Sequence, residues 1–133
     1  MKIAILLREE TAQRCTGKGC LRAFYEKGDS FARYKQDIEL VAFTHVGGDL
    51  DYKIEKMLAH GVEVVHLSSC LRAKSDEYEV LVDKLSNYFD VVGYTHGSEI
   101  GKNKAAIILE KKRMLKEKLE NTSFKQIDNT IRK

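Results

Sequence analysis

Three cysteines, Cys15, Cys20 and Cys70, carry the most recognisable chemistry in this 133-residue chain. A thiolate can bind a metal ion, attack an electrophile or exchange with a disulfide. An odd number of thiols cannot close a set of structural disulfides, and the first residues lack the pattern of an export signal. We therefore expect a reducing, cytoplasmic location, in which the cysteines are metal ligands, redox groups or small buried side chains.

The spacing around the first two cysteines does not fit two common enzyme motifs. A phosphatase loop, Cys-x5-Arg, needs an arginine at the sixth position after Cys15, but Arg22 stands at the seventh. A phosphate-binding loop, Gly-x4-Gly-Lys-Ser/Thr, fails because Lys18 lies between Gly17 and Gly19. The sequence thus carries no recognised catalytic motif and gives no basis for predicting an enzyme activity.

Four apolar runs predict the strands that must position the reactive groups. They cover residues 2–7, 38–43, 62–67 and 90–94. Helical spacing of large apolar side chains follows each run. The predicted helices cover about residues 20–28, 49–60 and 75–89, with a long amphipathic helix from Lys102. This alternation predicts a single three-layer α/β domain with a flavodoxin-like, four-stranded parallel sheet in the order 2-1-3-4.

Polar and sulfur-bearing side chains follow the strands, at the point where each predicted strand ends. They are Arg8 with the Cys15–Cys20 loop, then His45, then Ser68, Ser69 and Cys70, then Thr95 and His96. Because the carboxyl ends of parallel strands share one edge of a sheet, we expect these groups to meet there. Three thiolates with His96 or His45 would suit tetrahedral Zn²⁺. His66 lies inside the third strand, so we expect a hydrogen-bonded core histidine rather than a ligand.

Two alternative functions use the same loop. Cys15 and Cys20 would exchange dithiol and disulfide in a redox protein, because the helix dipole and Lys18 favour a thiolate at the start of a helix. Alternatively, the backbone N–H groups of the loop would bind a small anionic ligand. The residues of this ligand-binding alternative are Thr16, Gly17, Lys18, Gly19, Ser68 and Ser69.

Charge and hydropathy narrow the choice of partner. The net charge is +3, and residues 102–133 carry eight Lys and two Arg against four acids. The acids are mixed through this basic strip as on a solvated helix face, so we do not predict nucleic acid as a partner. No apolar run approaches the ~18 residues that span a bilayer. We predict a soluble protein that binds a metal ion or small ligand. The apolar stripe of its last helix packs on the domain or forms a homodimer contact.

Several blocks of the sequence resemble the CGGC-domain proteins. They are Arg8-x-x-Thr11-x-x-x-Cys15-x-Gly17-x-Gly19-Cys20, then Glu39–Thr44 before Gly47-Gly48, then Val65–Cys70, then Gly93-x-Thr95-His96. The resemblance extends over roughly residues 1–97 and implies a zinc-binding site at the sheet edge. It also implies that the three cysteines and His96 occupy family positions in that site.

The motif that names the family is changed in this chain. Cys-Gly-Gly-Cys reads Val46-Gly47-Gly48-Asp49 here, so two thiols are absent, although Asp49 would still offer an oxygen ligand and His45 a nitrogen. We therefore predict a CGGC-like α/β domain over residues 1–101. Residues 102–133 are predicted as an amphipathic basic helix and tail packed on the same domain. The predicted function is binding of zinc, or alternatively iron, by a reduced cysteine and histidine site.

Overall fold

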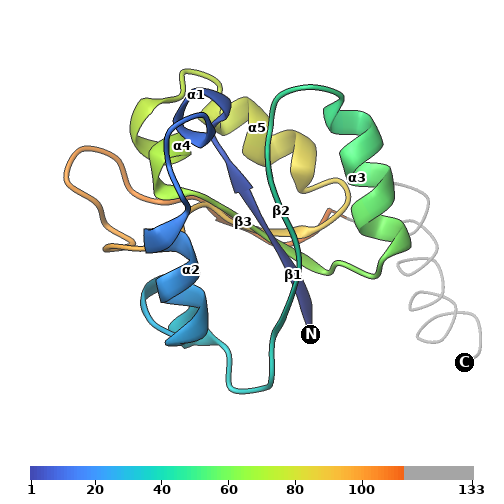
Figure 1. Cartoon of the computed structure of the whole chain (residues 1–133), viewed down its shortest axis with the longest axis horizontal. Coiled ribbons are helices and arrows are strands. Elements are labelled where there is room, and N and C mark those ends of the chain that lie inside the picture. Colours follow the sequence, from blue (N-terminus) through green and yellow to red (C-terminus); the bar gives the residue numbers. More distant parts are fainter. Residues whose placement is uncertain (113–133) are drawn as a thin grey trace, which may run out of the picture.

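A five-stranded sheet forms the centre of the structure, a computed structural model that describes residues 1–112. The strands are β1 (Lys2–Leu7), β2 (Glu39–His45), β3 (Val64–Leu67), β4 (Asp90–Val92) and β5 (Ile108–Leu109). Their order is β2-β1-β3-β4-β5, with the first four parallel and β5 antiparallel to β4 (Figure 1). The α/β class and the 2-1-3-4 order of the parallel strands are confirmed. The prediction of only four strands is wrong.

Helices pack against both faces of this sheet. They are α1 (Glu9–Ala12), α2 (Lys18–Tyr25), α3 (Leu50–Ala59), α4 (Ser69–Lys74) and α5 (Tyr78–Leu85), with a 3-10 helix, η1, at Asp29–Arg33. The sequence did not predict α1, α4 or η1, because one or two turns are too short for a clear apolar period. No helix in the described part of the chain has the length and hydropathy that crossing a bilayer requires.

The central strand β1 shows why its sequence is apolar throughout. Ile3 and Ile5 pack with the residues of α2 and η1, whereas Ala4 and Leu6 pack with those of α3 and α5. All four side chains are fully buried. Successive residues of a strand point to opposite faces, so a strand covered on both sides must be apolar at every position. The carboxyl end of this rigid strand then fixes where the next loop begins.

The segment after Lys102 is not the predicted helix. Residues 102–107 are irregular, and β5 follows them at the open edge of β4. The backbone N–H of Gly93 donates to Ile107 O at 2.8 Å, and the Ile107 N–H donates to the Tyr78 hydroxyl at 3.1 Å. These contacts extend the segment, because pairing with the edge strand satisfies backbone groups that would otherwise lack partners. The rest of the predicted helix, with its dimer contact, lies outside the described residues.

Candidate functional site

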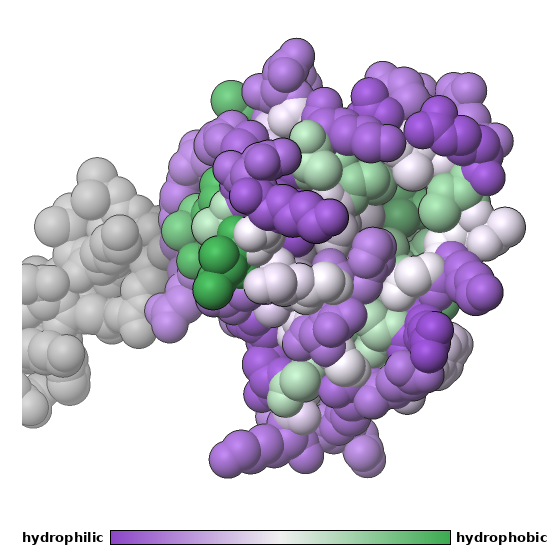
Figure 2. Space-filling model, turned by 90° about the vertical axis from the view of Figure 1, so that its left-hand side faces the viewer, coloured by the Kyte–Doolittle hydropathy of each residue, from purple (hydrophilic) through white to green (hydrophobic). Residues whose placement is uncertain are grey.

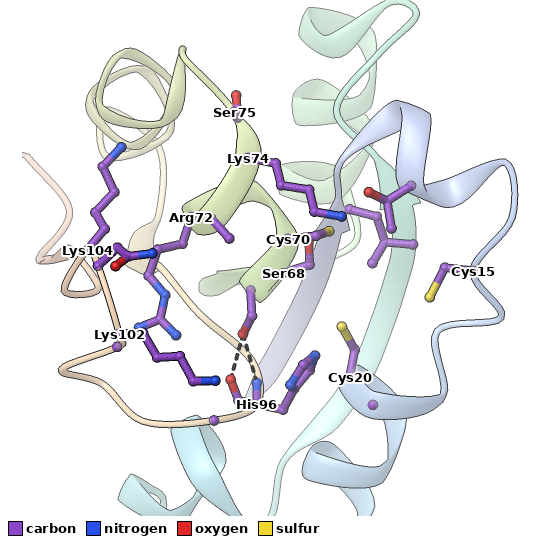
Figure 3. Close-up of a pocket in the computed structure, with 18 of the residues that line it drawn as sticks. Cys15, Cys20, Ser68, Cys70, Arg72, Lys74, Ser75, His96, Lys102 and Lys104 are labelled. Carbon is purple, nitrogen blue, oxygen red and sulfur yellow. Dashed lines mark hydrogen bonds between the residues drawn. The ribbon is translucent and has the colours of Figure 1, made fainter.

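A cavity of about 1000 Å³ lies beyond the carboxyl ends of β1, β3 and β4. Its walls come from the segment that leads into α2, from α4, and from residues 96–104. Cys15, Cys20, Cys70 and His96 all line it, and Figure 3 shows their side chains around one space. The structure therefore brings together four of the six predicted metal ligands, and all three cysteines in the chain are free thiols.

Cys15 and Cys20 stand on either side of the turn that begins α2. Gly17 has a φ of 80°, a left-handed conformation that favours glycine, and its N–H donates to Cys15 Sγ at 3.2 Å. Cys15 is exposed, whereas Cys20 is 5% exposed and its sulfur lies 3.1 Å from Thr95 Oγ1. Burial raises the pKa of the Cys20 thiol, although the Thr95 hydrogen bond opposes this. Cys20 is therefore not the acidified thiol that its place in the first helical turn predicted.

Cys70 and His96 are held by the serines that follow β3. Cys70 Sγ lies 2.7 Å from Ser68 Oγ. Ser69 Oγ donates to His96 O at 2.6 Å and accepts from His96 N at 3.3 Å, which fixes the backbone that carries the imidazole. The ring itself lies against Gly19, where an added Cβ would come within 3.0 Å of two ring atoms. Glycine at this position thus leaves room for the imidazole beside α2.

The other two predicted ligands, His45 and Asp49, do not line the cavity. His45 ends β2, and its Nδ1 accepts a hydrogen bond from the Gly47 N–H at 3.0 Å. Asp49 accepts from the Tyr52 N–H at 3.0 Å and so caps α3. The reason is the strand order, because β2 lies on the far side of β1 from β3 and β4. The glycine turn then leads the chain into α3.

The predicted anion-binding loop is likewise divided. Gly19, Ser68 and Ser69 line the cavity, whereas Thr16, Gly17 and Lys18 do not. Gly17 is instead buried under the ring of Phe43, which an added Cβ would strike.

The cavity is also lined by cationic side chains, which the sequence did not lead us to predict as site residues. They are Arg72, Lys74, Lys102 and Lys104. Two of them belong to α4, directly after the predicted cluster at residues 68–70. Following that segment for one further helical turn would have found them. The other two belong to the segment that was predicted as a helix.

The donor set of the cavity has the chemistry that zinc prefers. Zn²⁺ in proteins is bound mostly by cysteine sulfur and histidine nitrogen. Within residues 1–112, however, no three His, Cys, Asp or Glu side chains are grouped closely enough to hold a metal ion. The cavity thus gathers suitable ligand types without a formed coordination sphere.

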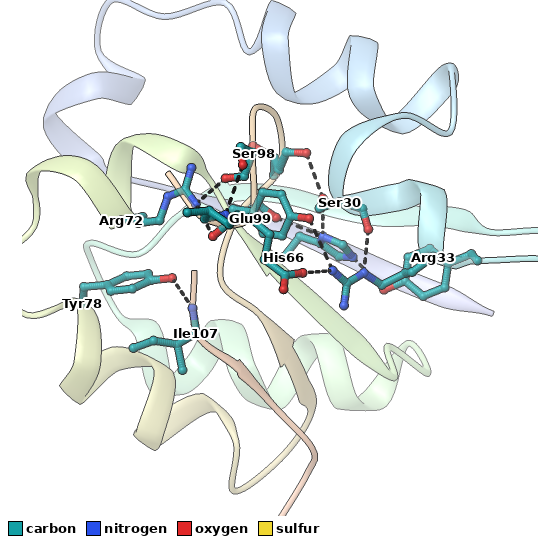
Figure 4. Close-up of polar contacts among 12 residues, drawn as sticks. Ser30, Arg33, His66, Arg72, Tyr78, Ser98, Glu99 and Ile107 are labelled. Atoms are coloured by element: carbon teal, nitrogen blue, oxygen red, sulfur yellow. Dashed lines mark hydrogen bonds and ion pairs between the residues drawn. The ribbon is translucent and has the colours of Figure 1, made fainter. Parts of the chain in front are cut away.

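His66 has a separate role from these residues. Its Nδ1 lies 3.0 Å from Ser30 Oγ and 3.2 Å from Tyr94 O, and its Nε2 lies 2.7 Å from the Tyr34 hydroxyl. Ser30 donates its own proton to Thr95 O, so Nδ1 carries the ring proton and Nε2 accepts from the Tyr34 hydroxyl. Figure 4 shows Ser30 beside the His66 ring. Burial lowers the pKa of His66 to about 3, which keeps the ring neutral. The prediction of a hydrogen-bonded core histidine is confirmed.

Most of the residues that line the cavity lie within a stretch of the chain that matches a known domain family. A family model of the CGGC domain matches residues 2–96, which include all four parallel strands, the three cysteines and His96. The chain belongs to the CGGC-domain family. Comparison with curated proteins gave no match, and neither did comparison with solved structures. The flavodoxin-like topology therefore stays a prediction. In this CGGC domain, the motif positions 46 and 49 carry valine and aspartate.

Proposed function

We propose that this CGGC-domain protein binds a thiophilic divalent metal ion, zinc above all, through its three cysteines and His96. The observation that carries the proposal is the hydrogen bonding of the sulfurs. Each of them lies beside a group that can donate to it, namely the Gly17 N–H, the Thr95 hydroxyl or the Ser68 hydroxyl. Donors of this kind stabilise a thiolate and orient it toward a metal ion.

Metal binding requires the four side chains to draw together. Cys15 is exposed, so rotation about its Cα–Cβ bond disturbs little packing, whereas Cys20 and Cys70 are carried by α2 and α4. The thiols must also lose their protons, and burial makes this costly for Cys20 because it raises the pKa. Occupancy should therefore fall with acid, since protons compete with the metal for sulfur.

The experiment is a titration of reduced protein with Zn²⁺ against a competing chromophoric chelator. We expect one ion per chain, and we expect the substitution Cys70→Ser or His96→Ala to weaken binding by at least about tenfold. His45→Ala is the matched control, because His45 also follows a strand but does not line the cavity. Failure of the reduced protein to take up stoichiometric zinc or iron would overturn the proposal. Equal losses in the two histidine variants would also overturn it.

A second candidate function, dithiol and disulfide exchange, is favoured by the asymmetry of Cys15 and Cys20. One thiol is exposed and the other buried, and both flank the same turn. Oxidation would join the two sulfurs, with two electrons and two protons passing to an oxidant such as oxidised glutathione. Thiol counts and peptide masses after equilibration with glutathione would test this. A reversible Cys15–Cys20 bond in protein that binds no metal supports exchange, and three unmodified thiols exclude it.

A further inference from the structure

We infer that the cavity also binds the anionic group of a small organic molecule, at a site built by Arg72, Lys74 and Lys102. This binding is independent of the proposed metal ion. It also differs from the predicted anion-binding loop, because its cations lie across the cavity on α4 and on residues 97–104.

Arg72 supplies the first observation, because it carries a positive charge that is 8% exposed. Its Nη1 donates to Ser98 O at 2.7 Å and Glu99 O at 3.2 Å, and its guanidinium lies 5.3 Å from the centre of the Tyr94 ring (Figure 4). Within residues 1–112 no carboxylate forms an ion pair with it, and the Glu99 carboxylate pairs with Arg33 instead. Carbonyl oxygens satisfy hydrogen bonds but do not neutralise a buried charge. An anion in the cavity would do so.

Two lysines extend the cationic surface into the cavity. Lys74 points toward Cys70, and Lys102 points toward His96 from the opposite wall (Figure 3). Neither lysine forms an ion pair in the described part of the chain. Two ammonium groups and a guanidinium that face one space are the arrangement that recognises phosphate or carboxylate groups.

The remaining charges do not cancel this surface. Lys104 is paired with Glu79 at 3.1 Å, so it adds little to the cavity. Among residues 1–112, Asp76 is the single carboxylate that lines it. The lining is therefore strongly cationic, although residues 1–101 carry 16 acidic side chains against 13 basic ones. A ligand of negative charge is the one that this lining favours.

The size and composition of the cavity indicate an organic molecule rather than a bare ion. A volume of about 1000 Å³ lies at the upper end of the usual range for small-molecule sites, whereas one water occupies only about 30 Å³. Leu7, Ala73 and the thiol side chains give it apolar wall as well. In Figure 2 weakly hydrophobic residues lie in a hollow between hydrophilic ones. The ligand should therefore combine an apolar body with an anionic end.

The test uses three ring compounds that differ in charge, namely phenyl phosphate, benzoate and benzyl alcohol. Metal is first removed from ¹⁵N-labelled full-length protein with EDTA, and the EDTA, itself an anion, is then removed by gel filtration. Each compound is titrated into this reduced protein, and amide shifts are followed by NMR. We expect both anions to shift resonances of residues 68–76 and 95–104, and benzyl alcohol to bind roughly tenfold more weakly. Tighter binding of phenyl phosphate assigns a phosphate site, tighter binding of benzoate assigns a carboxylate site, and equal binding assigns a site that accepts either anion.

Charge reversal separates ligand recognition from a structural role of Arg72, whose removal would also loosen residues 97–101. Lys74→Glu and Lys102→Glu should each weaken the preferred anion by about threefold or more. Lys35→Glu is the matched control, because this exposed lysine is outside the cavity and the change in net charge is the same. The inference would be overturned if benzyl alcohol bound as tightly as the anions, or if the anions shifted only resonances outside residues 68–76 and 95–104. It would also be overturned by the absence of shifts at millimolar ligand, or by unchanged affinity in both cavity variants. Because the protein is metal-free throughout, none of these outcomes bears on zinc.

Discussion

His66 lies in β3 and His96 follows the neighbouring strand β4, and yet the two histidines occupy opposite environments. His66 is fully buried, and both ring nitrogens have partners. His96 is exposed, and the hydrogen bonds around it hold its backbone rather than its ring. A polar group whose partners are all supplied by the protein stabilises the fold, because nothing is left to bind a ligand. A ring held only by its backbone, at the wall of a cavity, can still take a partner.

The contrast extends from the two histidines to their surroundings. Within residues 1–112 no buried side-chain nitrogen or oxygen lacks a hydrogen-bond partner, so the core around His66 is complete. Around the cavity, by contrast, Arg72 has a buried charge without a carboxylate partner. The two polar regions should therefore respond differently to mutation and to pH.

The largest expected effect is the loss of stability in His66→Ala. The substitution removes a ring stacked 4.1 Å from Phe31 and leaves the Tyr34 hydroxyl and Tyr94 carbonyl without their partner. We expect the free energy of unfolding to fall by about 3 to 4 kcal/mol, against less than about 1 kcal/mol for His96→Ala. Urea unfolding at neutral pH measures both. Similar losses for the two variants would remove the distinction between the regions.

The buried, neutral ring of His66 should also make the stability of the protein depend on pH. The pKa of His66 is about 3 in the folded state, below the ordinary value of 6.5. The unfolded chain therefore binds this proton first, so the stabilisation is complete above pH 6.5 and is lost as the pH falls toward 3. Between pH 6.5 and 4.5 we expect a loss of about 2 to 3 kcal/mol.

The control for this pH effect is His66→Gln, measured over the same window. Carboxylates contribute to both proteins, so only the difference between the two slopes reports His66. A variant whose stability falls as steeply as that of the parent would show that His66 does not cause the pH dependence.

An intermediate effect on stability is expected from Tyr78→Phe, in the core on the α5 side of the sheet. The buried Tyr78 hydroxyl donates to Gly93 O at 2.6 Å and accepts from Ile107 N, so it joins α5, β4 and the approach to β5. Its removal should cost about 1 to 2 kcal/mol. Tyr52→Phe, at a side chain that is 54% exposed, should cost less than about 0.5 kcal/mol. Hydrogen exchange at the Ile107 amide checks the mechanism, because it should accelerate in Tyr78→Phe and not in Tyr52→Phe.

The sequence predicted the parallel strands because each is an apolar run with its own turn signals. It failed at β5 because alanines and isoleucines between residues 105 and 109 also have helical spacing, and only contact with β4 and Tyr78 selects the extended form. The spacing of apolar residues along the sequence carries no information about that contact.

The candidate site, like the fold, was predicted from the sequence only in part. The strand ends predicted that the cysteines and His96 would lie near one another, because a parallel sheet gathers its carboxyl ends at one edge, and all four line the same cavity. The same rule misplaced His45 and Asp49, because it does not say which strand ends face the same loop. It also missed Arg72 and Lys74, because their positions on α4 depend on a helix that the pattern did not show.

The smallest effects on stability are expected from substitution of the cysteines that line the cavity. Cys15→Ser should change the free energy of unfolding by less than about 0.5 kcal/mol, because the side chain is exposed. Cys20→Ser should cost about 1 kcal/mol, because its buried sulfur packs with the α2 side of the core.

Modification with an aromatic disulfide reagent should rank the same thiols without any mutation. Cys15 should react first because it is exposed, Cys70 should follow because it is half-buried, and Cys20 should react last. The pKa of Cys20 is raised by burial, so both its accessibility and its thiolate fraction are low. Stoichiometric Zn²⁺ should then protect all three sulfurs if they bind one ion. If zinc protects Cys15 but leaves Cys70 reactive, the two sides of the cavity do not share a metal ion. The proposal of one site that uses all three sulfurs would then be wrong.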